Sequence, residues 1–399
     1  MFNFKRFFLL TLSFIISLII PRSKNIIVVG SRDGKRFADN SRYLFYYLNK
    51  EKKFKIIWLT KSKKIQSYLR MQNFEVLISN SAIGLYYGFR AKYHIFDYSE
   101  YDTSEFSSMR AHKINLGHGI YIKKVTSRVK NPNFLNDTYN YFVNKKNFHI
   151  YPNKKYATHI LNYFPKNKYK LIVSNFPRNI FLHDRKYINW GYTTTYENKI
   201  LKRLKSIKGK RIGYFPTWRK DYQDLFLDLK NYGKLKKLND ILKKNDSFLV
   251  LKHHSNHFKE DSAKNFNNKD VAINFSLNKL SNFINLNYDT DLNTVMCYCD
   301  LLISDYSGAI IDYLITNRPI ILYTPDIKKY EKDPGLFFNY NNLNFSHKAV
   351  KYETLINLIN EYLEDCNKFS KKYYYQRKRM KNIFFENNSF FTKITNLIN

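Results

Sequence analysis

Residues 300–312 read DLLISDYSGAIID and contain a strand, a polar loop and the start of a helix. The apolar run at 301–303 is typical of a buried strand, and the apolar residues at 309–311 begin a helix directly after the loop at 304–308. Units of this kind build parallel sheets that helices cover on both faces. Ligands bind such sheets beyond the carboxyl ends of the strands, so the loop at 304–308 is a candidate ligand site.

The residues of this loop suit both helix capping and anion binding. Ser304, Asp305 or Ser307 can cap the helix, because a side-chain oxygen accepts hydrogen bonds from the first free N–H groups. The same N–H groups, from Gly308 onward, can bind an anion. The two roles are compatible with each other.

The alternation of short apolar runs and helical stretches extends along most of the chain. The expected strands are 26–29, 56–59, 74–78, 93–96 and 113–116, followed by 211–214, 248–251, 271–275, 283–286, 301–304 and 320–323. A strand–helix–strand rhythm favours parallel sheets, so we predict an α/β protein with two doubly wound, Rossmann-like domains and a cleft between them.

The domain limits follow from changes in composition. The stretch at 178–205 is polar and irregular, and residues 350–399 are helical in pattern and highly charged. We therefore predict a first domain over 23–185 and a second over 186–399, which ends in a C-terminal helical cover.

The overall composition excludes some classes of protein. With 44% hydrophobic residues the chain can bury a core, which excludes wholesale disorder, and three cysteines exclude a disulfide scaffold. The net charge of +36 suggests an anionic partner, but scarce glycine and proline beside abundant lysine are also typical of an AT-rich genome. No helix-turn-helix, zinc or base-stacking motif accompanies the charge, so we expect no nucleic-acid partner.

The N-terminus suggests contact with a membrane. Residues 7–20 form an apolar run that follows Lys5 and Arg6, and it is shorter than the roughly 20 residues of a spanning helix. Arg22 and Lys24 occupy the place where a signal peptide would be cleaved. We predict that residues 1–22 dip into an anionic membrane surface, the alternative being a buried first helix of the folded domain.

A Gly-His-Gly sequence follows the expected strand at 113–116. Gly117 and Gly119 flank His118, and Lys123 and Lys124 come soon after. Glycines allow a sharp turn and close approach to a ligand, so His118 could act as a general base or contact phosphate with a lysine as support. The alternative is a turn histidine with solvated lysines.

Two further strand ends carry polar side chains. Thr217 and Arg219 follow the strand at 211–214, and arginine suits bidentate binding of phosphate. Lys252 and His254 follow the strand at 248–251, where they can contact phosphate. Histidines also bind metals, but no acidic or cysteine ligand lies at a standard spacing, so we expect no metal site there.

These segments, in this order, resemble the CDP-glycerol glycerophosphotransferase family, the enzymes of teichoic-acid priming and polymerisation. The resemblance covers about residues 25–345. The similar segments are HGIYIK (118–123) to the family's HGTPLK, FPTWR (215–219) to APTWR, KHHS (252–255) to KPHP, DLLISDYSG (300–308) to DxLITDYSS, RPIILY (318–323) to RPIIxY, YEKDPGLFFNY (330–340) to YEKxxGFYFDY, and, upstream, GKRFADNSRYLFYYL (34–48) to GxxxSDNxxxxYxxL.

The sequence departs from the family pattern at three points. Ile120 and Tyr121 replace the family's threonine and proline, KHHS replaces KPHP, and Gly308 replaces the second serine of DYSS. These changes leave the polyol and the acceptor open.

The resemblance implies a GT-B fold and a reaction in which an acceptor hydroxyl attacks the glycerol-bearing phosphate of CDP-glycerol and releases CMP. It implies no metal or other cofactor, CDP-glycerol held mainly by the second domain, and a lipid-linked or polymeric glycan acceptor at the cytoplasmic face of a bacterial inner membrane. His118 is the expected base, and His254 the expected contact to the donor pyrophosphate. The other expected substrate-binding residues are Gly117, Gly119, Lys123, Thr217, Arg219, Lys252, Ser304, Asp305, Ser307 and Gly308.

Two alternatives remain at this point. One is a different GT-B transferase for capsule or lipopolysaccharide, which uses a CMP-sugar, a UDP-sugar or CDP-ribitol. The other is a basic, membrane-attached protein that binds anionic polymer without chemistry.

Overall fold

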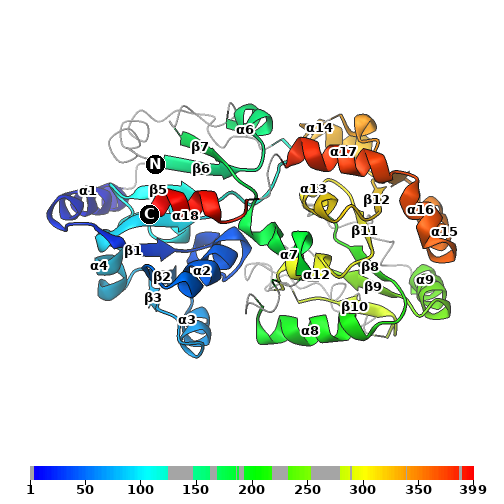
Figure 1. Cartoon of the computed structure of the whole chain (residues 1–399), viewed down its shortest axis with the longest axis horizontal. Helices are drawn as coiled ribbons and strands as arrows, with labels where there is room; N and C mark the ends of the chain where they lie inside the picture. Colours follow the sequence, from blue (N-terminus) through cyan, green and yellow to red (C-terminus); the bar gives the residue numbers. More distant parts are fainter. Residues whose placement is uncertain are drawn as a thin grey trace.

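The computed structural model describes most of the chain. The described residues are 4–124, 147–161, 169–185, 187, 193–217, 232–252, 279–287, 290–337, 339–385 and 389–399. The chain forms two parallel sheets that lie side by side, each covered by helices (Figure 1).

The first sheet has seven strands in the order β3-β2-β1-β4-β5-β6-β7. Its strands are β1 (Ser23–Val29), β2 (Lys55–Thr60), β3 (Val76–Ile78), β4 (Ala91–Phe96), β5 (His112–Asn115), β6 (Asn147–Tyr151) and β7 (Tyr169–Val173). Its helices include α2 (Asp39–Glu51), α3 (Lys63–Arg70), α4 (Ala82–Arg90) and α6 (Lys154–Leu161). The strand order reverses between β1 and β4, which is where a doubly wound sheet binds its ligand.

The second sheet has six strands in the order β10-β9-β8-β11-β12-β13 and reverses between β8 and β11. Its strands are β8 (Arg211–Tyr214), β9 (Phe248–Leu251), β10 (Phe283–Asn285), β11 (Leu301–Ser304), β12 (Ile320–Tyr323) and β13 (His347–Ala349). Its helices include α8 (Thr195–Ser206), α9 (Tyr232–Lys244), α12 (Leu292–Met296), α13 (Ala309–Tyr313), α14 (Ile327–Lys332), α15 (Tyr352–Glu364) and α16 (Cys366–Lys371).

This architecture confirms the predicted α/β class and ten of the eleven expected strands, while 271–275 lies outside the described residues. Three strands, β6, β7 and β13, were not predicted. The expectation of irregular chain at 178–205 is wrong, because α8 fills its second half. Thr194 and Glu197 form a reciprocal capping box that begins this helix.

The end of the chain returns to the first sheet, which corrects the assignment of all terminal helices to the second domain. After α17 (Tyr374–Phe384), helix α18 (Thr392–Ile398) lies beside the strands of the first sheet (Figure 1). The Tyr47 and Phe391 rings stack with centroids 4.1 Å apart, and the Tyr93 hydroxyl donates to the Leu397 carbonyl. The physical reason is the apolar face of α18, which is buried there.

Buried polar contacts join the two halves of the molecule. Arg42 of α2 pairs with Glu197 of α8 at 2.6 Å, and both side chains are 1% exposed. The neighbouring Tyr43 hydroxyl donates to Asp291, at the start of α12, over 2.7 Å. Because a buried charge is costly without its partner, these contacts fix how the two sheets face each other.

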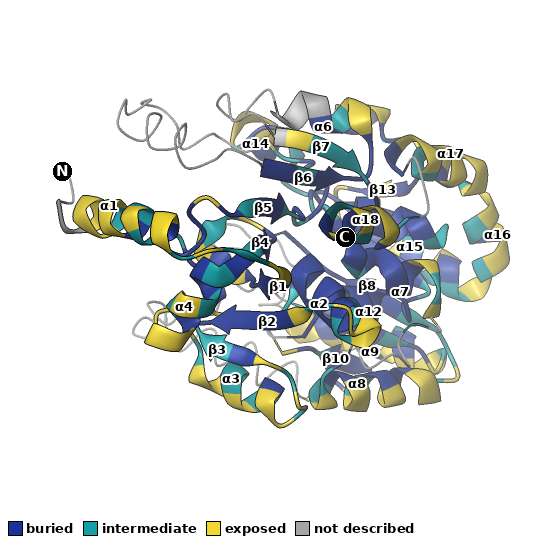
Figure 2. Ribbon diagram, turned by 60° about the vertical axis from the view of Figure 1, so that its left-hand side comes forward, coloured by how far each residue is buried: buried dark blue, intermediate teal, exposed yellow. Residues whose placement is uncertain are grey.

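Helix α1 (Phe4–Ile19) extends from the body of the protein with much of its surface exposed (Figure 2). Its exposed apolar side chains include Phe8 at 59% and Ile19 at 74%. In the part of the chain that the structure describes, no helix has the length and apolar character needed to cross a membrane.

Candidate active site

The Gly-His-Gly loop follows β5 at the carboxyl edge of the first sheet. Gly117 and Gly119 have φ values of +66° and +124°, which glycine adopts without strain. Asn40, in the first turn of α2, donates from Nδ2 to the Gly117 carbonyl over 2.7 Å. A Cβ built on Gly119 would lie 2.5 Å from Nη2 of Arg178, so a larger residue at this position would have to displace a guanidinium that Asp312 holds.

His118 projects from this loop into an aromatic and cationic environment. Its Nδ1 lies 3.3 Å from the Tyr121 hydroxyl, and no hydrogen bond to its Nε2 is present among the described residues. Burial, and then the nearby Arg32, lower the pKa of His118 to about 3. The imidazole is therefore neutral near pH 7 and can accept a proton.

Asp39 and two arginines surround the histidine. Arg32 donates to one carboxylate oxygen of Asp39 over 2.6 Å, and Arg178 donates to the other over 2.7 Å. Burial alone would raise the pKa of Asp39, but Arg178 and Arg32 outweigh it and hold the pKa at about 2. The carboxylate is thus ionised and anchors both guanidinium groups beside His118.

Arg178 also connects this cluster to the second sheet. Its Nη2 donates to Asp312 of α13 over 2.7 Å, and Asn179 donates to the other oxygen of Asp312 over 2.9 Å. Burial raises the pKa of Asp312, although Arg178 opposes that shift. We regard Asp312 as ionised, because two donors share its carboxylate within 3 Å.

The loop that follows β5 packs directly against loops of the second half. A Cβ built on Gly308 would lie 2.8 Å from the Ile120 carbonyl oxygen. Further along, the Phe337 amide donates to the Ile122 carbonyl over 2.8 Å, and the Lys124 amide donates to the Gly335 carbonyl over 2.9 Å. The structure therefore brings together the Gly-His-Gly loop and the Ser-Asp-Tyr-Ser-Gly loop, which the sequence separates by almost 190 residues.

Within the second loop, two predicted ligands are engaged by the protein itself. Ser304 is fully buried and donates to the Phe215 carbonyl over 2.6 Å. Asp305 is 3% exposed and accepts from the Thr217 amide over 2.8 Å and from the Thr217 hydroxyl over 2.5 Å. These hydrogen bonds hold the loop in shape, while the predicted contacts of Ser304, Asp305 and Thr217 with substrate stay predictions.

Among the predicted site residues that the structure describes, those that are partly exposed are His118, Lys123, Lys252, Ser307 and Gly308. Helix α13 is only five residues long, so its dipole is small. The Tyr306 and Ala309 amides donate to Asp305 and Ser307, so the candidate anion donors of the loop are the Ser307 and Gly308 amides. Burial lowers the pKa of Lys123, while Asp305 acts in the opposite direction, which places these two residues near each other.

The remaining predicted residues are placed only in part. Lys252 is half-buried at the end of β9, and its amide donates to the Tyr214 carbonyl over 3.3 Å. Arg219 and His254 lie outside the described residues, so their roles stay predictions. Within the described ranges, no group of three or more histidine, cysteine, aspartate or glutamate side chains could hold a metal ion.

Sequence reasoning missed Arg178 and Asp312 as site residues, and it included Asp39 and Asn40 only within the segment at 34–48 that resembles the family. Arg178 comes shortly after β7, so it follows the same strand-end rule as the other site residues. Recognising β7 from the apolar residues at 171–173 would have identified it.

The comparisons with known proteins agree with this geometry. The sequence pattern of the family described as CDP-Glycerol:Poly(glycerophosphate) glycerophosphotransferase matches residues 12–398. The chain belongs to this family. It is therefore a glycerophosphotransferase by family, which favours that activity over the sugar-transfer and non-enzymatic alternatives.

Curated relatives of this glycerophosphotransferase match over most of their length. A teichoic acid poly(glycerol phosphate) polymerase from Bacillus spizizenii is 26% identical, with 87% of this chain and 89% of the relative covered. A teichoic acid glycerol-phosphate transferase from Staphylococcus aureus is 25% identical, with 89% of each chain covered. The solved structure of the wall teichoic acid polymerase TagF has a TM-score of 0.68 at 22% identity and covers 94% of this chain and 89% of its own, which confirms the GT-B fold.

Proposed function

We propose that the chain transfers glycerol phosphate from CDP-glycerol to a hydroxyl of a membrane-linked glycan or polyol-phosphate chain and releases CMP. The observation that carries this proposal is the contact between the loops at 117–120 and 304–308, which gives one site a neutral histidine and anion-binding N–H groups. The family match and the names of the curated relatives support the donor and the class of acceptor.

In this proposal the acceptor oxygen forms a bond to the glycerol-bearing phosphorus, and the bond from that phosphorus to the oxygen of CMP breaks. His118 takes the proton of the acceptor hydroxyl at Nε2, because Nδ1 faces Tyr121. An anionic donor raises the affinity of the imidazole for this proton. Such transfer depends on positioning and charge neutralisation more than on covalent catalysis.

The proposal assigns the neutralisation of phosphate charge to the protein and places no metal or other cofactor in the site. Lys123 and Arg32 supply positive charge from the first half, and Arg32 keeps 44% of its side chain exposed. Ser307 and the Gly308 amide supply donors from the second half. Lys252 and the predicted residues Arg219 and His254 complete the donor site.

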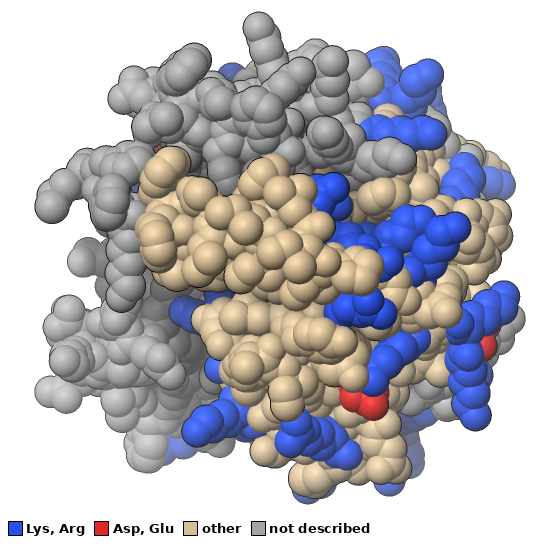
Figure 3. Space-filling model, turned by 90° about the vertical axis from the view of Figure 1, so that its left-hand side faces the viewer, with Lys and Arg blue, Asp and Glu red and all other residues tan. Residues whose placement is uncertain are grey.

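We further propose that α1 lies in the cytoplasmic leaflet of a bacterial membrane. Arginines surround its base: Arg110 donates to the Ser17 carbonyl over 3.0 Å, and Arg90 donates to the Pro21 carbonyl over 2.9 Å. Figure 3 views the molecule from the side on which α1 lies and shows lysine and arginine side chains gathered beside an area of other residues. An apolar helix with basic residues around it suits an anionic lipid surface.

A donor panel tests the proposed activity. The purified chain is incubated with an extract of teichoic-acid-bearing membranes, which supplies the acceptor. Each of three reactions contains one donor: CDP-glycerol, CDP-ribitol or UDP-glucose. We expect release of CMP from CDP-glycerol with a matching increase in polymer-bound glycerol phosphate. Release of nucleotide from UDP-glucose or CDP-ribitol alone would overturn the proposal.

A further inference from the structure

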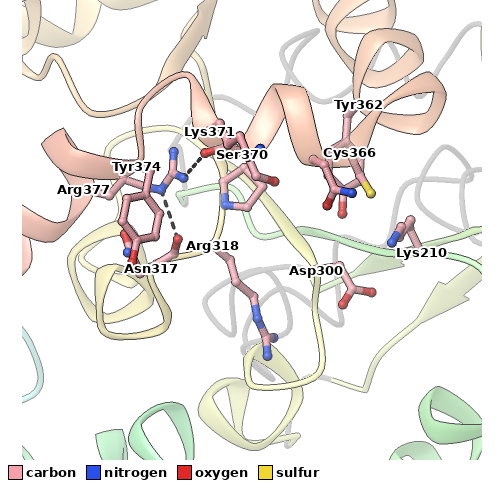
Figure 4. Close-up of a pocket in the computed structure, with 12 residues that line it drawn as sticks. Lys210, Asp300, Asn317, Arg318, Tyr362, Cys366, Ser370, Lys371, Tyr374 and Arg377 are labelled. Atoms are coloured by element: carbon pink, nitrogen blue, oxygen red, sulfur yellow. Dashed lines mark hydrogen bonds between the residues drawn. The ribbon is translucent and has the colours of Figure 1, made fainter.

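A cavity lies at the amino ends of the strands of the second sheet, whereas the candidate active site lies at their carboxyl ends. It has a volume of about 360 Å³, within the range of roughly 300–1,000 Å³ that is usual for ligand sites. Lys210, Asp300 and Pro319 line it and stand directly before β8, β11 and β12, at the amino ends of these strands. Helices α16 and α17 provide its other wall (Figure 4).

The lining of this cavity is strongly cationic. Its basic residues are Lys210, Arg318, Lys371 and Arg377. Among the described residues that line the cavity, Asp300 is the only acidic one, and Nη2 of the adjacent Arg211 already pairs with it at 2.7 Å. The cavity therefore carries positive charge that the described protein residues do not neutralise.

Arg377 is the feature that points to a ligand. Its side chain is fully buried, and it donates from Nε to the Asn317 carbonyl over 3.2 Å and from Nη2 to the Ser370 carbonyl. Its third nitrogen, Nη1, is buried and has no hydrogen-bond partner in the part of the chain that the structure describes. No described carboxylate pairs with this guanidinium, and burial lowers the pKa of Arg377 to about 10. A buried arginine in this state is costly unless an anion completes its contacts.

We propose that this cavity binds a phosphate-bearing anion, with the Arg377 guanidinium at its closed end and Lys371 and Lys210 as further cationic contacts. Hydrogen bonds from a guanidinium to phosphate oxygens are charge-assisted, and Nη1 is the Arg377 nitrogen with no acceptor among the described residues. Arg318 contributes charge, while its Nη1 remains on the Cys297 and Cys299 carbonyls.

Asn317 narrows the choice of phosphate. Asn317 lines the same cavity, and its Oδ1 is also buried without a hydrogen-bond partner among the described residues. An acceptor at this position matches the P–OH of monohydrogen phosphate, which a phosphodiester lacks. The site therefore favours inorganic phosphate over a diester unit of a glycerol-phosphate polymer.

Thermal unfolding of the full chain tests the site without any turnover assay, so it is independent of the proposed function. Inorganic phosphate is titrated against sodium chloride at equal ionic strength, and the half-maximal phosphate concentration for the rise in Tm is measured. We expect Lys371→Glu to increase this concentration at least tenfold. The matched control is Lys378→Glu, an exposed lysine of α17 outside the cavity, which should respond like the wild type.

Equal responses of the wild type and Lys371→Glu would overturn the proposal, as would equal losses in both lysine variants. Arg377→Gln should abolish the rise in Tm with phosphate. If Arg377→Gln does not fold, Lys210→Glu serves as the second test in its place. A parallel titration with glycerophosphoglycerol, a phosphodiester, distinguishes a site for inorganic phosphate from a site for a diester unit of a glycerol-phosphate polymer. A weaker response than to inorganic phosphate supports the assignment of Asn317, and a stronger response contradicts it.

Discussion

Gly308 and Ile120 touch across the two halves of the molecule: a Cβ on Gly308 would lie 2.8 Å from the Ile120 carbonyl oxygen. This separation is shorter than real Cβ contacts allow, and the opposing atom is backbone, which cannot move aside cheaply. The family pattern has a serine at the position of Gly308, and this contact gives a physical reason why this chain has a glycine there instead. In this chain the two loops lie too close for a side chain.

Substitution of Gly308 should therefore separate the loops and slow catalysis. We expect Gly308→Ala and Gly308→Ser each to lower kcat/KM for CDP-glycerol by about tenfold, because small misplacements of reacting groups are costly. The measurement is CMP release at several donor concentrations. Since the Cβ causes the effect in both variants, an active Gly308→Ser beside an inactive Gly308→Ala would refute this explanation.

Loss of Arg178 should destabilise the whole protein. Arg178→Met leaves Asp39 and Asp312 without their shared cation, and breaking a buried ion pair costs about 3 kcal/mol or more. The free energy of unfolding in urea measures the loss. Asp39 keeps its ion pair with Arg32, so Asp312 is the carboxylate left without a cation. The double variant Arg178→Met/Asp312→Asn removes that charge and should recover part of the loss; no recovery would argue against the ion pair.

The buried His94 should make stability depend on pH. Burial, and then Arg22, lower its folded pKa to about 3, whereas a histidine in the unfolded chain has a pKa of about 6.5. Between these values only the unfolded state binds the proton, so the free energy of unfolding falls as pH decreases below about 6.5. At pH 5 the expected loss is on the order of 2 kcal/mol for this residue.

Urea unfolding at pH 7 and pH 5 checks this expectation. His94→Gln keeps a polar side chain near the Thr103 hydroxyl and the Gly88 carbonyl, the two hydrogen-bond partners of the imidazole. The variant should lose less stability between the two pH values than the wild type does. Equal losses would show that His94 takes up its proton in the folded state.

The exposed face of α1 should govern binding to lipid vesicles. Phe8→Glu and Ile19→Glu each place a carboxylate on this face, and we expect each to weaken binding to anionic vesicles at least fivefold in a sedimentation assay. Met71→Glu is the control, because Met71 is 82% exposed and lies outside α1. An equal loss in all three variants would indicate a general charge effect instead of insertion of α1.

The sequence predicted the fold well where apolar runs were long enough to recognise. It missed β13, because the three residues at 347–349 read HKA and carry no apolar pattern. It missed β7, because its apolar residues at 171–173 follow a lysine-rich stretch. Since β7 precedes Arg178, this omission also hid a central residue of the site.

The candidate site was predictable in part for a similar reason. Residues at strand ends, such as His118 and Ser307, follow from the geometry of parallel sheets. Contacts between the two halves, such as that of Arg178 with Asp312, depend on how the two sheets face each other, which local sequence patterns do not encode. Burial likewise decided that Ser304 positions the loop.

The central claim is that His118 accepts the proton of the acceptor hydroxyl in glycerol-phosphate transfer. The most direct test is the kcat for CMP release from CDP-glycerol by His118→Ala, with His112→Gln as the control, since His112 begins the strand that leads to His118. The account predicts a loss of about a hundredfold or more for His118→Ala and nearly wild-type activity for His112→Gln. Near-full release of CMP by His118→Ala would contradict it.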